Sequence, residues 1–74
     1  MAKVRRVGPA LRMLRERAGV SQEELARRAG FDHSKVSRLE KGIQRLTLTD
    51  LAVLAGGLGL EVRDVLDAAS RRAA

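Results

Sequence analysis

The chain has 74 residues, of which 45% are hydrophobic and 32% are charged, and it contains no cysteine. This length fits one domain near the size at which a core is only marginally sufficient, and the apolar content predicts a folded chain. The lack of cysteine excludes disulfides and thiolate metal sites. One aromatic residue, Phe31, is too few for the stacking platforms of single-stranded nucleic-acid binding.

The net charge of +6 is unevenly distributed. Residues 1–45 hold twelve Lys/Arg against five Asp/Glu, whereas residues 46–74 hold three against four. A cationic surface in one half of a chain is typical of proteins that bind a polyanion. The longest uncharged run, Leu51–Leu60, is ten residues long, well short of the roughly twenty that span a membrane. We therefore expect a protein that stays inside the cell, in the cytoplasm.

Residues 1–8 are expected to form a flexible basic arm, because Lys3, Arg5 and Arg6 have no acidic partner and follow no helical period. One interpretation is a solubilising tail, and the other is an arm that follows a DNA backbone or enters a minor groove. The folded domain is predicted to span residues 9–69, followed by a tail at 70–74.

The first helix is predicted to run from Pro9 to about Ala18, since proline suits a first helical turn. Its buried stripe contains Leu11, Leu14 and Ala18, and Arg15 lies within that stripe. A charge on an apolar face is costly unless it is paired.

Gln22–Lys41 is predicted to be a helix, a tight turn and a second helix. Ser21 can cap the first helix, with Glu24 completing a capping box. Gly30 should end that helix because glycine adopts the left-handed conformation without steric cost. Asp32 is the expected N-cap of the next helix, with its carboxylate accepting backbone N–H groups. Two helices joined by so short a turn form a helix-turn-helix.

The second helix of this motif is amphipathic. Val36 and Leu39 point inward, and Glu40 lies beside them. We predict a largely buried ion pair between Glu40 and Arg15 that fastens the first helix to this one. The alternative is that both side chains reach out to water. The opposite face carries hydroxyl, imidazole, guanidinium and ammonium groups and no carboxylate, as suits contact with base edges and phosphates in a major groove.

Two further helices are predicted. Thr47 caps the fourth, whose broad apolar face is formed by Leu48, Leu51, Ala52, Leu54, Ala55 and Leu58. The fifth runs from Glu61 to about Ala69, with Val62, Val65 and Leu66 apolar. Candidates for a subunit contact are Val53, Leu60 and Val62, which are equally consistent with scattered surface apolar residues.

The stretch Gln22–Lys41 resembles the helix-turn-helix of the lambdoid phage repressor and Cro family, the XRE-like regulators. Leu25, Ala26, Gly30, Val36 and Leu39 stand where that motif has apolar, small, turn, apolar and apolar residues. The resemblance extends from about Leu11 to Leu66. It implies an all-α, compact five-helix lambda-repressor-like domain that dimerises through its C-terminal half.

We expect four residues to contact bases: His33, Ser34, Ser37 and Arg38. Six residues are expected to contact phosphates. The resemblance suggests four of them: Gln22, Lys41, Gln44 and Arg45. The other two are Arg28 and Lys35. Arg38 is the best candidate for guanine, because its forked guanidinium can bond O6 and N7 together.

The predicted function is sequence-specific binding of double-stranded DNA by a transcriptional regulator, which we expect to be a repressor acting as a dimer on a near-palindromic operator. The alternatives are an antitoxin that binds a toxin and its own promoter, or a bridging cofactor that recruits transcription machinery. No enzyme is predicted, since Asp32, His33 and Ser34 are consecutive and cannot align as a triad. With one histidine and no cysteine, we expect neither a metal nor a cofactor.

Overall fold

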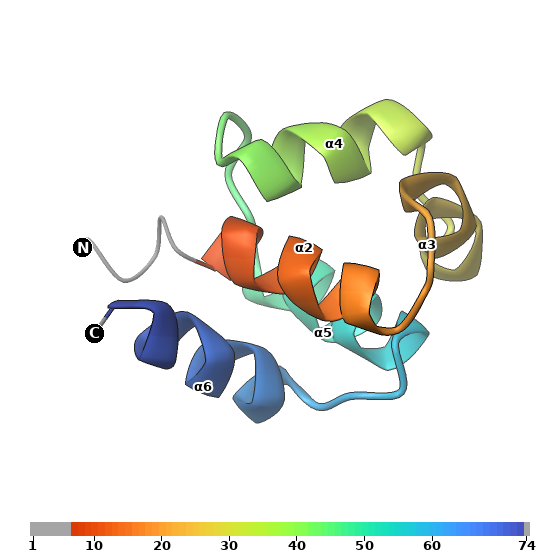
Figure 1. Cartoon of the computed structure of the whole chain (residues 1–74). Helices are drawn as coiled ribbons and strands as arrows, with labels where there is room; N and C mark the ends of the chain where they lie inside the picture. Colours follow the sequence, from red (N-terminus) through yellow and green to blue (C-terminus); the bar gives the residue numbers. More distant parts are fainter. Residues whose placement is uncertain (1–6, 74) are drawn as a thin grey trace.

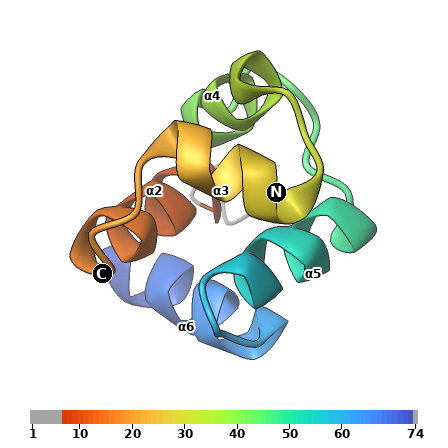
Figure 2. The same cartoon turned by 90° about the vertical axis from the view of Figure 1, so that its right-hand side faces the viewer.

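The computed structural model describes residues 7–73 and contains five helices and no strands in that part of the chain. Helix α2 lies between α4 and α6, and α3 packs against α4 and α5 (Figures 1 and 2). The helices are α2 (Val7–Arg17), α3 (Gln22–Ala29), α4 (His33–Lys41), α5 (Leu48–Gly57) and α6 (Val62–Ala73). No helix among residues 7–73 is long and apolar enough to cross a membrane.

The core draws at least one large apolar side chain from every helix. The largest fully buried side chains are Leu11, Leu25, Val36, Leu39, Leu54 and Val65. Burial of each such side chain contributes about 1.5–3 kcal/mol, and together they fix the position of α4 against α2 and α3. The predicted all-α, five-helix architecture is confirmed.

The turn of the helix-turn-helix is formed as predicted, with two exceptions. The Glu24 carboxylate pairs with Arg27 and Arg28 and does not complete the predicted capping box with Ser21. The Ser21 hydroxyl accepts a hydrogen bond from the Glu24 N–H at 3.0 Å. Gly30 ends α3 with φ +74°, and the Phe31 N–H donates back to the Ala26 carbonyl at 2.8 Å. Asp32 occupies the N-cap position of α4, but its side chain makes no capping hydrogen bond, so that part of the prediction was wrong.

Several predicted boundaries and faces differ from the structure. Helix α2 begins at Val7, two residues before Pro9, so the last two residues of the expected arm are helical and buried. Helix α6 continues through residues 70–73, which had been assigned to a tail, because no glycine or proline stops it earlier. Four residues predicted on buried faces, at positions near helix ends or on the outer side of a helix, are exposed instead: Ala18, Leu48, Ala52 and Leu66.

Gly8 allows α2 to approach the end of α4. A Cβ atom at this position would lie 2.5 Å from the Leu39 carbonyl oxygen and 2.8 Å from that of Glu40. These are backbone atoms, so they cannot move aside as a flexible side chain would. Gly8 therefore sets the distance between α2 and the helix that carries the candidate site.

We expect Gly8→Ala to lower the free energy of unfolding by about 1–3 kcal/mol, because the two helices must move apart. Urea denaturation followed by circular dichroism measures this change. Gly56→Ala is the matched control, since Gly56 lies within α5 and its added Cβ would meet nothing within 4 Å. This control should be neutral or stabilising by up to about 1 kcal/mol. Equal effects at the two positions would contradict the close approach.

Candidate nucleic-acid interface

Helix α4 separates its apolar and polar residues as predicted. Val36 and Leu39 are 0% and 1% exposed. On the opposite side His33, Ser34, Arg38 and Lys41 are exposed and Ser37 is half-buried. The only carboxylate of the helix, Glu40, is turned inward and buried. The outward face therefore carries hydroxyl, imidazole and cationic groups and no carboxylate of α4.

The predicted Arg15–Glu40 ion pair is present and explains why Glu40 faces inward. Arg15 Nε lies 2.7 Å from Glu40 Oε2, and Arg15 Nη2 lies 3.1 Å from Oε1. A third donor, Nη1, reaches the Val20 carbonyl at 2.8 Å. The hydrogen bond to Glu40 raises the pKa of Arg15 and outweighs the opposing effect of burial. The alternative in which both side chains reach water is excluded, since they are 8% and 1% exposed.

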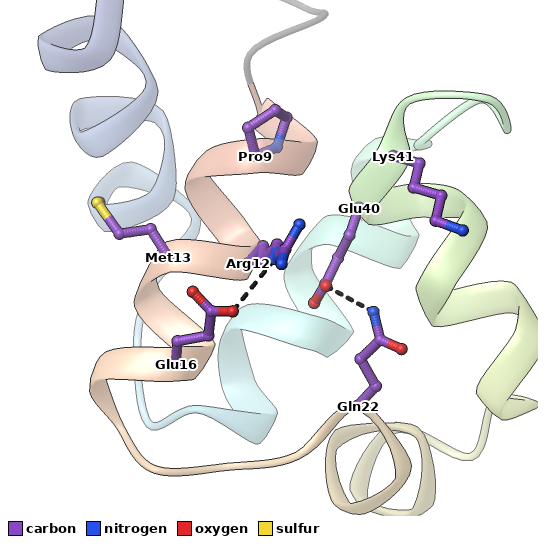
Figure 3. A pocket seen from close by; sticks show the side chains of 7 residues that line it. All are labelled: Pro9, Arg12, Met13, Glu16, Gln22, Glu40 and Lys41. Carbon is purple, nitrogen blue, oxygen red and sulfur yellow. Dashed lines mark hydrogen bonds and ion pairs between the residues drawn. The ribbon is translucent and has the colours of Figure 1, made fainter.

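Gln22 joins this ion pair to the first turn of α4. Its Nε2 donates to Glu40 Oε1 at 2.9 Å, and its Oε1 lies 3.1 Å from His33 Nε2. Figure 3 shows the Gln22 and Glu40 side chains pointing toward each other. Sequence reasoning placed Gln22 at a phosphate and missed this second role. No local pattern signals it, because Gln22 and Glu40 are far apart in the chain and meet only through helix packing.

A surface hollow opens where α2, α3 and α4 meet (Figure 3). Gln22 and Glu40 lie on its wall, and Lys41 lies at its α4 side. Arg12 also lines it and forms an exposed pair with Glu16 at 3.2 Å. The hollow therefore combines the amino end of α3 with two cationic side chains, Arg12 and Lys41.

Arg38 is held by a residue that had been assigned to phosphate binding. Its Nε donates to Gln44 Oε1 at 2.7 Å, across the end of α4. This bond engages Nε, and the two terminal nitrogens of Arg38 form no hydrogen bond within residues 7–73. Gln44 lies in the loop after Gly42, so the geometry depends on how that loop folds back.

The other four predicted phosphate contacts divide into two groups. Lys35 pairs with Asp50 at 3.5 Å and stands 4.0 Å from the Phe31 ring centroid. Arg28 donates hydrogen bonds to Glu24 and to the Gly57 carbonyl, each at 2.9 Å, and so links α3 to the end of α5.

The second group has no partner in the described part of the chain. Lys41 and Arg45 are exposed, and within residues 7–73 their side chains form no ion pair or hydrogen bond. Arm residues Lys3, Arg5 and Arg6 lie outside the described residues.

More large apolar side chains are exposed to solvent than the sequence predicted, because Leu48 and Leu66 are not buried. Of the proposed subunit contacts, Val53 is 39% exposed, while Leu60 and Val62 are partly buried against the core. Leu48 and Leu66 are 71% and 47% exposed. They line one shallow groove together with Val7, Leu46, Thr47 and Leu51. Helical periodicity could not reveal this exposure, because it depends on where the neighbouring helix ends.

Comparison with known proteins agrees with this geometry. A family model described as a helix-turn-helix domain matches residues 6–69. The clp gene regulator ClgR from Corynebacterium glutamicum is 33% identical, with a TM-score of 0.91 over 97% of this chain and 94% of its own. The restriction-modification controller protein C.AhdI from Aeromonas hydrophila is 37% identical, with a TM-score of 0.81 over 88% of this chain and 98% of its own.

A curated relative from Neisseria meningitidis serogroup B, named as a hypothetical transcription factor, is 36% identical over 56 residues. The match covers 76% of this chain, and the chain spans about half the length of that relative, 53%. The family model and the two solved structures establish the family. The chain belongs to the helix-turn-helix family and, within it, to the XRE-like transcription regulators.

Proposed function

We propose that this chain binds double-stranded DNA in a sequence-specific manner and represses transcription as a dimer on a near-palindromic operator. The observation that supports this most strongly is the outward face of α4. It presents donors and cations while its one carboxylate, Glu40, is paired inside the protein. Such a face fits a major groove, where base edges and phosphates accept hydrogen bonds.

Within this proposal the residues divide by what they are free to contact. Arg38 reads guanine, and His33, Ser34 and Ser37 contact the neighbouring bases. Lys41 and Arg45 hold phosphates, because neither has a partner among residues 7–73. Gln22 contributes its backbone N–H and the second hydrogen of its amide, at the positive end of α3. Lys35 and Arg28 would have to leave existing ion pairs and are assigned secondary roles.

Selection of bound duplexes from a random pool tests the proposal directly. The expected result is enrichment of two related half-sites whose centres lie about one helical turn, roughly 34–36 Å, apart. The selection should be run at moderate ionic strength, because nonspecific phosphate binding dominates at low salt. Failure of any duplex to be enriched would contradict sequence-specific binding.

The subunit contact of the proposed dimer is placed on the groove that contains Leu48 and Leu66, with a second copy of this chain as the occupant. Leu48→Asp and Leu66→Asp should each shift the protein toward monomer, because a buried unpaired carboxylate is costly. Analytical ultracentrifugation at micromolar concentration measures the shift. Val53→Asp is the comparison on the outer side of α5 and should leave the dimer intact. If Val53→Asp alone dissociates the protein, the contact lies on that side instead.

A further inference from the structure

A continuous set of hydrogen bonds leads from the core to the first residue of α4. It begins at Arg15 and Glu40, which are 7% and 3% exposed. Gln22 is the next residue, and its Nε2 donates to Glu40 Oε1 at 2.9 Å. It ends at His33, whose Nε2 lies 3.1 Å from Gln22 Oε1. The last residue is exposed and belongs to the proposed base-reading face.

The chemistry of each partner fixes the direction of every bond. An arginine side chain only donates, and an ionised carboxylate only accepts. Glu40 therefore requires the NH₂ group of Gln22, and a reversed amide would place two acceptors in contact. This leaves Gln22 Oε1 facing His33, where it can only accept. The proton must be on His33 Nε2, and a neutral imidazole then has an acceptor at Nδ1.

We propose that the buried ion pair fixes His33 as the Nε2–H tautomer, so that protonation changes its Nδ1 from an acceptor to a donor without moving the ring. Both protonation states keep the bond from Nε2 to Gln22. Within residues 7–73, His33 Nδ1 has no hydrogen-bond partner and is the atom left for a base. The inference rests on the proposed function, since it assigns a preference to one position of the DNA site.

The expected preference follows from the exocyclic groups of the bases. A neutral Nδ1 accepts from the amino groups of adenine or cytosine, whereas a protonated one donates to the carbonyl oxygens of guanine or thymine. Histidine is the side chain whose protonation state most commonly changes between pH 5 and 8. The base favoured at the position contacted by His33 should therefore change over this range.

The other charged groups on and around α4 either form ion pairs or are exposed on the surface. Helices α2 and α3 pack against α4. On α2, Arg12 pairs with Glu16 and Arg15 pairs with Glu40, and Arg17 is exposed. On α3, Glu24 pairs with both Arg27 and Arg28, and Glu23 is exposed. On α4 itself and just before it, the remaining charged groups are Asp32, Lys35, Arg38 and Lys41.

The tautomer is tested in the free protein. His33 is the single histidine of the chain, so side-chain ¹⁵N NMR of the untagged protein reports it without ambiguity. At pH 8 the protonated nitrogen should be Nε2, with a proton that exchanges slowly. Gln22→Leu should make this proton exchange rapidly while the fold is retained. A proton on Nδ1, or an exchange rate unchanged by Gln22→Leu, would overturn the inference.

The preference is tested by duplex selection at pH 5.5 and pH 8.0. At one base position, the ratio of carbonyl-bearing to amino-bearing bases should rise about tenfold at the lower pH. His33→Gln should give the same ratio at both values. Enrichment that is independent of pH would overturn this inference and leave the proposed function standing. A uniform gain in affinity at low pH, with no change of base, would also overturn it. No enrichment at either pH would overturn both proposals.

Discussion

Glu40→Gln should lower the free energy of unfolding by about 3–5 kcal/mol, the cost of leaving a buried charge without its counterion. Arg15 cannot escape by losing its proton, because a guanidinium stays charged in proteins even without a carboxylate beside it. Nor can it reach water easily, since its side chain is 8% exposed and also bonds Val20. A typical domain is stable by only 5–15 kcal/mol, so this one change should bring the protein close to unfolding. Urea denaturation followed by circular dichroism is the measurement.

Two further variants separate the ion pair from a general effect of substitution. Arg15→Met combined with Glu40→Leu should recover most of the lost stability, because an apolar pair of similar volume avoids the desolvation of both charges. Arg12→Ala removes the exposed pair with Glu16 on the same helix and should cost less than about 1 kcal/mol. An unchanged urea midpoint for Glu40→Gln would show that the pair contributes nothing net.

The helix-turn-helix was predictable because its signals are local. Ser21 and Gly30 act within three or four residues of their own positions, and the chain folds there as their chemistry requires. The Arg15–Glu40 pair was also predictable, although it joins distant residues. Each charge lay on an otherwise apolar face, and the two faces had to meet.

The contacts that were missed depend on tertiary geometry alone. Gln22 contacts His33, and Arg38 contacts Gln44, only because α3, α4 and the following loop pack at particular distances. Gln22 and Gln44 were expected to contact phosphates, and in the structure they also hold His33 and Arg38, which were expected to contact bases. Sequence patterns place such polar side chains on a helix face but do not show which distant side chains they bond within the protein.

Arg38→Ala should relax preference at one base pair by about 1–3 kcal/mol, which corresponds to roughly 5- to 150-fold in discrimination between bases. Its guanidinium is exposed on α4 and can bond guanine O6 and N7 together. Arg38→Lys should lose most of the same preference, because an ammonium lacks the planar fork. Competition binding against duplexes that differ at single positions measures the loss.

Lys41→Ala is the control from the same helix, chosen because Lys41 is expected at a phosphate. It should weaken binding to all duplexes equally and reduce the slope of log Kd against log salt by about 1. Gln44→Ala should resemble Arg38→Ala in milder form, because removing the 2.7 Å bond frees the guanidinium from its orientation. If Arg38→Ala instead lowers affinity uniformly, Arg38 contacts the backbone, and base reading must rest on His33, Ser34 and Ser37.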